Sequence, residues 1–254
     1  MLNPSGRDDT LALFCLPYAG GSATVFRDWQ ARMPAWLELV PLNLPGRGVR
    51  QRMAPLHRLD ELIAVLIDDM RPRLDRPFAI FGHSMGALVG FELAQALRRV
   101  AGVSPRWLGV SACRAPSRRE RETHWLTCPE PEFLDEVRAL NGMPDELLDN
   151  REFMELVMPM LRADFHLCGT YEPQPARPRL TCPMLVIGGA RDAELAGDPA
   201  NLAAWADETA GPVVHREIDA GHFFINTHRE ELIGHVLDSL ATVRGPGRLA
   251  GLAG

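Results

Sequence analysis

Six short apolar runs alternate with helical patterns along this chain, and that alternation limits the folds open to it. From Leu59 to Met70, for example, apolar residues recur three and four positions apart, which is the spacing of one helix face. Strands that alternate with helices pair in parallel, because each helix returns the chain to the same end of the sheet. The sequence therefore predicts an α/β fold with a mostly parallel central sheet flanked by helices. We expect its strands at Leu11–Leu16, Leu37–Leu42, Phe78–Phe81, Trp107–Ala112, Met184–Ile187 and Val213–Ile218.

The alternation is interrupted between residues 114 and 170, where only helical signals occur. A connection between neighbouring strands does not need this length. Residues 130–140 and 151–167 have the pattern of two amphipathic helices, with a turn cluster at 141–144 between them. We therefore predict a helical lid inserted into a single domain. Its expected parts are a core of about 10–113 and 171–242, the lid at 114–170, and a flexible Gly-rich tail at 243–254.

A serine stands where the third predicted strand meets an apolar helical run, in Gly82-His83-Ser84-Met85-Gly86. A turn this tight leaves no room for side chains at the two glycine positions, because they would collide with neighbouring backbone. The strain exposes the Ser84 hydroxyl at the edge of the sheet. The pattern is typical of a nucleophile elbow.

A serine hydroxyl needs a histidine base, and the chain has eight histidines. In α/β hydrolases the chain order is serine, then acid, then histidine. His222 follows the sixth predicted strand, at the sheet end where ligands bind in parallel sheets. His215 is rejected because it falls in the middle of that strand. We predict His222 as the base, with Thr227 to Glu230 as a capping box that starts the last helix and fixes the loop.

The orienting acid is predicted to be Asp192, in a Gly-Gly-Ala-Arg-Asp segment after the fifth strand. Three other carboxylates lie nearby. Asp219 is too close to His222 along the chain to reach the far side of its ring and is typical of a turn. Glu194 and Asp198 fit the start of a helix at Asp198-Pro199 better.

An oxyanion hole needs two backbone N–H groups directed at the developing charge. One is expected from Met85, directly after the nucleophile. The other is expected from Ala19, in the Gly-rich loop after the first strand, with Tyr18 shaping the pocket. An ordinary connecting turn would have a similar sequence.

Charge and composition argue against several classes of function. The chain has 27 basic and 33 acidic residues, a net charge of −6, so we expect no nucleic-acid partner. All 27 basic residues are arginine, which excludes lysine-dependent chemistry such as Schiff-base catalysis. The first nine residues are polar and no run of about 18 apolar residues occurs, so we expect a soluble cytoplasmic protein without a membrane partner.

No recognisable cofactor motif occurs in the sequence. There is no H-E-x-x-H, no Cys/His cluster and no G-x-G-x-x-G after a strand. The five cysteines include no C-x-x-C pair and are expected to be reduced thiols. These observations predict hydrolysis without a metal or cofactor.

Seven segments spread over about Leu11 to Leu240 together resemble the type II thioesterases that accompany polyketide synthases and nonribosomal peptide synthetases. They are Leu16-Pro17-Tyr18-Ala19-Gly20-Gly21-Ser22, Leu44-Pro45-Gly46-Arg47-Gly48, Gly82-His83-Ser84-Met85-Gly86, Arg114-Ala115-Pro116, Leu161-Arg162-Ala163-Asp164, Gly188-Gly189 with Asp192, and Gly221-His222-Phe223-Phe224.

The resemblance implies an α/β-hydrolase fold with a helical lid and a triad of Ser84, Asp192 and His222. It also implies a substrate: an acyl or peptidyl group held as a thioester on the phosphopantetheine of a carrier protein. Product-releasing thioesterase domains often carry the acid after the fourth strand, and the segment 113–117 has no carboxylate. We therefore expect a free-standing editing enzyme that removes aberrant or stalled acyl groups, and we expect it to accept small acyl thioesters.

The lid and its neighbours provide candidate contacts. Apolar lid residues are expected to bound the acyl chamber, although the same stripe would also pack the lid on the core. The substrate-binding candidates are Tyr18, Phe153, Met160 and Phe223, and the wider lid stripe adds Leu156, Val157 and Leu161. Arginines at 114, 118, 119 and 121 could meet an acidic carrier protein or simply be solvated.

Two other functions remain open at this point. A carboxylesterase or lipase would use the same triad on oxoesters. An α/β-hydrolase-like protein could also bind a small molecule without catalysis, as occurs when triad members are lost, although all three are present here.

Overall fold

The computed structural model describes residues 10–140, 143, 145–174, 177–195 and 197–244. Most of the predicted tail, residues 245–254, and positions 141, 142 and 144 of the predicted turn lie outside this range. Within the described residues, no helix combines the length and the hydropathy needed to cross a bilayer.

A six-stranded sheet in the order β2-β1-β3-β4-β5-β6 forms the centre of the molecule, and every strand pair is parallel. The predicted sheet is confirmed, with boundaries shifted by one or two residues. The strands β3 and β5 run further than predicted because their ladders with neighbouring strands continue to His83 and Gly189. The strands are β1 (Leu11–Leu16), β2 (Leu37–Pro41), β3 (Phe78–His83), β4 (Leu108–Ser111), β5 (Met184–Gly189) and β6 (Val213–Ile218).

Eight α-helices and five short 3₁₀ segments connect and cover these strands within the described residues. The α-helices are α1 (Leu59–Met70), α2 (Met85–Ala101), α3 (Glu130–Ala139), α4 (Asp145–Leu148), α5 (Arg151–Gly169), α6 (Ala200–Ala203), α7 (Phe224–Thr227) and α8 (Arg229–Ala241). The 3₁₀ segments are η2 (Ala23–Arg32), η3 (Gly48–Arg50), η4 (Arg71–Arg73), η5 (Pro116–Arg118) and η6 (Ala204–Asp207).

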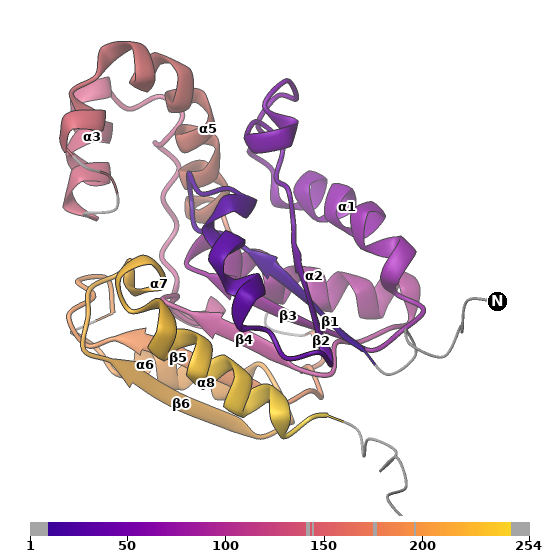
Figure 1. Ribbon diagram of the computed structural model, residues 1–254. Coiled ribbons are helices and arrows are strands. Elements are labelled where there is room, and N and C mark those ends of the chain that lie inside the picture. Colours follow the sequence, from indigo (N-terminus) through magenta and orange to yellow (C-terminus); the bar gives the residue numbers. More distant parts are fainter. Residues whose placement is uncertain (1–9, 141–142, 144, 175–176, 196, 245–254) are drawn as a thin grey trace, which may run out of the picture.

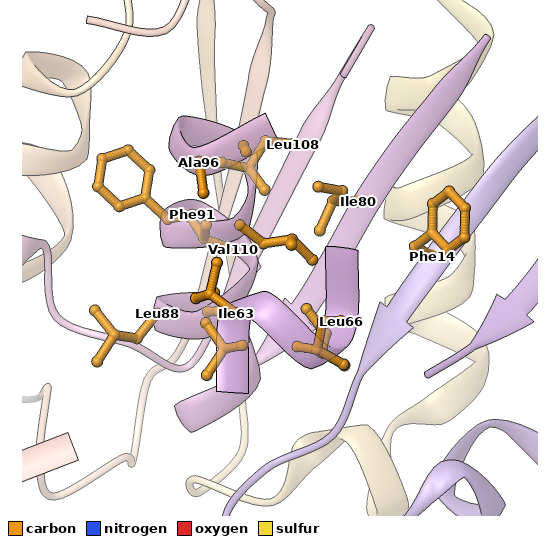
Figure 2. Packing of buried hydrophobic residues seen from close by; sticks show 14 of the residues in the cluster. Phe14, Ile63, Leu66, Ile80, Leu88, Phe91, Ala96, Leu108 and Val110 are labelled. Atoms are coloured by element: carbon orange, nitrogen blue, oxygen red, sulfur yellow. The ribbon is translucent and has the colours of Figure 1, made fainter. Parts of the chain in front are cut away.

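The two faces of the sheet carry separate cores because successive side chains of a strand point to opposite sides. In β1, Phe14 packs with α1 and α2 on one face, whereas Leu13 packs with η2 and α8 on the other. Figure 2 shows part of the first core, to which Leu88 and Phe91 of α2 and Val110 of β4 belong. Both faces of the central strands β1 and β3 are therefore covered, whereas the edge strand β6 is exposed over most of its length.

The lid segment has a small core of its own, built around Trp125 and Phe133. Helices α3 and α5 stand together beyond one end of the sheet (Figure 1). Met160 and Leu161 are buried in this cluster, while Leu156 is 78% exposed. The apolar stripe of α5 thus mainly packs the lid on itself.

Two local predictions about helix starts need correction. The capping box at Thr227 does not form, because Thr227 ends α7, and α8 begins at Arg229 without a side-chain cap. The helix predicted at Asp198-Pro199 starts at Ala200, whose N–H donates to the Asp198 carboxylate at 2.9 Å. Asp198 therefore caps this helix as predicted, but the helix begins at Ala200 and not at Pro199.

Candidate active site

The turn between β3 and α2 holds Ser84 in a strained backbone conformation. Ser84 has φ 55° and ψ −120°, a region that residues other than glycine rarely adopt. A Cβ on Gly82 would lie 2.0 Å from the carbonyl oxygen of Gly86, and one on Gly86 would lie 2.2 Å from that of Leu16. The close approach that the sequence pattern predicts is therefore present on both sides of the serine.

Three side chains from three strand ends form one hydrogen-bonded chain. Ser84 Oγ lies 2.9 Å from His222 Nε2, and His222 Nδ1 lies 2.8 Å from Asp192 Oδ2. Asp192 and His222 are buried, and the second carboxylate oxygen of Asp192 accepts the N–H of Glu194 at 3.0 Å. The structure thus brings together the serine, histidine and aspartate that the sequence singles out.

The protonation of His222 depends on two opposed effects. Burial disfavours the imidazolium, but the hydrogen bond and the negative charge of Asp192 outweigh it, so the pKa of His222 is raised above 6.5. The hydrogen bond to Asp192 also places the ring proton on Nδ1 when the ring is neutral, which leaves Nε2 free to accept from Ser84. This is the arrangement that a general base requires.

His83 holds the catalytic loop from behind, a role that the sequence analysis does not predict. Its ring is fully buried, with Nδ1 2.9 Å from Ser111 Oγ and Nε2 2.9 Å from the carbonyl oxygen of His222. Burial, with a smaller effect of His222, lowers the pKa of His83 well below 6.5, so the ring is neutral. The position of His83 next to the nucleophile was the one sequence signal for this role. Its hydrogen-bond partners could not be predicted, because they lie 28 and 139 residues away along the chain.

The competing carboxylates are engaged elsewhere. Asp219 pairs with Arg191, and Asp198 pairs with Arg118 in addition to capping α6. The side chain of Glu194 is exposed. Only Asp192 among these acids reaches His222.

Two backbone N–H groups are available beside Ser84. Ala19 and Met85 both line the cavity that contains the serine. Among the hydrogen bonds of the described residues, neither of their N–H groups has an acceptor. Free donors next to a nucleophile can stabilise a negatively charged oxygen.

The cavity at Ser84 has a volume of about 190 Å³ and runs from the end of β4 to the lid. Its lid wall comes from Trp125 and from the last turns of α5, through Phe165, Cys168 and Gly169. The volume is small, which suits a short acyl group better than a long chain.

None of the four predicted substrate-binding residues lines this cavity. Tyr18 and Phe223 pack edge to face at 5.0 Å, and the Tyr18 hydroxyl accepts from Asn226 at 3.2 Å. Phe153 and Met160 belong to the core of the lid. The part of α5 that borders the cavity, residues 165–169, lies closer to the C-terminal end of the helix than predicted. The predicted apolar stripe, residues 153–161, mainly packs with the rest of the lid instead.

The four arginines that could meet a carrier protein or simply be solvated all make contacts within the chain. Arg118 pairs with Asp198, Arg121 lies 3.0 Å from Glu172, and Arg114 donates to the Glu194 carbonyl. Arg119 lines the cavity, where its guanidinium donates to the Cys168 carbonyl at 3.2 Å and to Cys113 Sγ. Burial raises the pKa of Cys113 to about 11, so this thiol stays protonated beside the nucleophile.

The described residues contain no group of three His, Cys, Asp or Glu side chains that could hold a metal ion. All five cysteines are free. The expectation that no metal or cofactor is used stays a prediction.

The parallel sheet, the strained serine turn and the hydrogen-bonded Ser-His-Asp chain together define a serine hydrolase of the α/β-hydrolase fold. Comparison with known proteins then gives the family. The family model described as "Thioesterase domain" matches residues 12–240, so the chain belongs to the thioesterase family and is a thioester hydrolase.

Relatives of known name support this family membership. The chain is 35% identical over 236 residues to the gramicidin S biosynthesis protein GrsT of Aneurinibacillus migulanus, covering 93% of this chain and 91% of that protein. A solved structure, the RedJ thioesterase from the prodiginine pathway of Streptomyces coelicolor, superimposes with a TM-score of 0.82. It is 36% identical and covers 90% of this chain and 85% of that chain.

One relative carries a different kind of name. The chain is 38% identical over 231 residues to the linear gramicidin dehydrogenase LgrE of Brevibacillus parabrevis, covering 90% of this chain and 87% of that protein. The present sequence has no G-x-G-x-x-G after a strand to hold a dinucleotide. Its site instead carries the elements of acyl transfer.

Proposed function

We propose that this protein is an editing thioesterase that hydrolyses acyl groups from the phosphopantetheine arm of a carrier protein in a polyketide or nonribosomal peptide synthase. The observation that carries the proposal is the Ser84–His222–Asp192 hydrogen-bonded chain beside a small cavity, in a chain of the thioesterase family. GrsT and RedJ, by their names, take part in gramicidin S and prodiginine biosynthesis. The small cavity fits the removal of short acyl groups that stall a synthase.

The reaction follows from the positions of the side chains. His222 Nε2 takes the hydroxyl proton of Ser84 while Ser84 Oγ bonds to the thioester carbonyl carbon. The carbonyl oxygen becomes negatively charged, and the N–H groups of Ala19 and Met85 stabilise it. The C–S bond then breaks, the carbonyl re-forms, and the sulfur leaves with the proton that His222 held.

Water completes the cycle in a second displacement. His222 takes a proton from water as the water oxygen attacks the acyl-serine. The ester bond to Ser84 breaks, Ser84 recovers its proton from His222, and a free acid is released. These steps use no metal and no cofactor. The five free cysteines support a reducing compartment such as the cytoplasm.

The test compares thioester with oxoester turnover in the wild type and in Ser84→Ala. The substrates are butyryl-phosphopantetheinyl carrier protein, the butyryl thioester of N-acetylcysteamine, and the matching oxoester. We expect the carrier-bound thioester to have the highest kcat/KM and Ser84→Ala to lower kcat by about 10⁶. Preference for the oxoester would identify a carboxylesterase instead, and unchanged turnover in Ser84→Ala would contradict both enzyme functions.

A further inference from the structure

A buried ion pair between Arg47 and Asp164 joins three separate segments and has no part in the reaction described above. Arg47 lies in the loop after β2, and Asp164 lies on the lid helix α5. The guanidinium donates from Nη1 and Nη2 to the two carboxylate oxygens at 2.5 and 2.6 Å, and the residues are only 7% and 2% exposed. A two-pronged contact of this kind fixes the orientation of both side chains.

Both partners also hold the backbone of the loop that carries Ala19. Asp164 Oδ2 accepts the N–H of Gly20 at 2.8 Å, and Arg47 Nη1 donates to the carbonyl of Gly21 at 3.3 Å. Leu161, which lies one turn before Asp164 on α5, makes an apolar contact with the same loop. A Cβ on Gly20 would lie 2.6 Å from Leu161 Cδ2. Helix α5 therefore touches this loop through two of its side chains.

The segment from Tyr18 to Gly21 is a type II β-turn with Ala19 as its second residue. The N–H of Gly21 donates to the Tyr18 carbonyl at 2.9 Å, and Gly20, the third residue, has φ +79°. Type I and type II turns differ in the orientation of the peptide between the second and third residues. Rotation of that peptide would turn the Gly20 N–H away from Asp164, so this hydrogen bond favours the type II form. The Ala19 N–H belongs to the preceding peptide, so the contact acts on this donor by fixing the position of the whole turn.

We propose that Arg47 and Asp164 are positioning residues that fix the oxyanion loop, so that docking of lid helix α5 completes the oxyanion hole. An oxyanion hole is effective because its donors are oriented before the charge develops. The inference rests on the proposed function, because it takes Ala19 as one of those donors. It also gives the Leu44–Gly48 and Leu161–Asp164 segments, which are distant in sequence from the triad, a part in the reaction.

The test replaces the ion pair by apolar side chains of similar size in the double variant Arg47→Met/Asp164→Leu. Such replacements commonly preserve folding, because no charge is left buried without a partner. The matched control is Arg50→Met/Asp69→Leu, which removes a half-buried pair, 2.5 Å apart, between the same loop and α1. The control pair makes no contact with the oxyanion loop among the described residues.

Three measurements separate positioning from mere support of the fold. The first is kcat and KM for the butyryl thioester of N-acetylcysteamine. The second is the affinity for the trifluoromethyl ketone with the same chain, to which Ser84 Oγ adds, leaving a negatively charged oxygen in the oxyanion hole. The third is the affinity for the thioether in which a methylene replaces the carbonyl, which places no oxygen there.

In the folded double variant we expect kcat and ketone affinity to fall together by about 10- to 100-fold, below the 10²- to 10³-fold effect of deleting an oxyanion donor. KM and thioether affinity should stay within about twofold, and the control should resemble the wild type. Wild-type kcat and ketone affinity in the folded double variant would overturn the proposal. Ser84→Ala decides the proposed function separately, since it tests the nucleophile and not the loop.

Should the double variant fail to fold, Arg47→Lys provides the same comparison. Lysine keeps the charge but cannot make the two-pronged contact or reach the Gly21 carbonyl at the same time. We expect a parallel fall of several-fold in kcat and ketone affinity with an unchanged thioether affinity. A ketone affinity equal to that of the wild type would overturn the proposal here as well.

Discussion

Gly86 is the residue on which the shape of the serine turn most depends. An added Cβ would lie 2.2 and 2.6 Å from the carbonyl oxygens of Leu16 and Pro17, and backbone atoms of β1 cannot move aside without disturbing the sheet. We expect Gly86→Ala to lower the free energy of unfolding by about 3 kcal/mol or more, as overpacking of a rigid site does at its upper range. Urea denaturation measures the change.

A matched glycine provides the control for this substitution. Gly234 lies in α8 with open space around its Cβ position. Gly234→Ala should raise the stability by up to about 1 kcal/mol, because alanine favours the helix. Equal effects of the two substitutions would show that the crowding at the elbow is not what requires glycine.

The raised pKa of His222 sets the acid limit of the reaction. The free enzyme needs a neutral imidazole to accept the serine proton, so kcat/KM should fall as the pH drops through the pKa of His222. We expect this acid limb of the pH profile of kcat/KM to have its midpoint above pH 6.5. Burial lowers the pKa of His222, but Asp192 raises it by more. In Asp192→Asn the imidazole stays buried but loses the charge that favours its protonated form, so an NMR titration should give a pKa below 6.5. A wild-type limb at or below pH 6.5 would contradict this account.

At the scale of single elements, the last turns of α5 should control which acyl groups fit. Phe165 and Phe153 of this helix both pack against the lid core, but only Phe165 of the two also borders the cavity. We expect Phe165→Leu to shift the ratio of kcat/KM for pentanoyl over butyryl thioesters upward by about tenfold, the order of one methylene in an apolar pocket. Phe153→Leu is the control and should leave the ratio unchanged. If both variants shift it equally, lid packing rather than the cavity wall sets the preference.

The lid also shows what could and could not be predicted for an element. Its two main helices follow from apolar spacing within each segment, and their boundaries agree to about two residues. The face of α5 that meets the cavity could not be predicted, because its residue Phe165 packs against Trp125 and Phe133, and these lie far from it in the sequence. Periodicity identifies an apolar stripe but does not say which apolar surface covers it.

At the scale of the whole molecule, the parallel sheet is what assembles the site. Ser84 and His222 are 138 residues apart, yet each follows a strand, and parallel strands end at one edge. Topology alone therefore predicts that the serine, the aspartate and the histidine converge. No topological rule of this kind predicts the Arg47–Asp164 ion pair, which joins a loop to a lid helix. The single sequence shows the two segments that contain these residues but does not indicate that they are in contact.

The fully buried, neutral His83 links the stability of the whole molecule to pH. Its pKa in the folded protein lies well below 6.5, the usual value that it regains on unfolding. Below pH 6.5 the unfolded chain therefore binds a proton that the folded protein does not. The stabilising contribution of the neutral ring is complete above pH 6.5 and is lost as the pH falls towards the folded-state pKa.

The predicted slope of this loss reaches about 1.4 kcal/mol per pH unit, the value for one proton. His222 acts in the opposite sense, because its raised pKa favours the folded state below pH 6.5 and this contribution disappears as the pH rises through the folded-state value. Comparing the wild type with His83→Gln isolates the effect of His83, since His222 is present in both proteins. Urea unfolding between pH 4.5 and 7.5 measures the free energy of unfolding of both proteins. We expect it to depend less steeply on pH in the variant, even if the variant is less stable at every pH. Identical slopes would show that His83 takes up its proton in the folded protein.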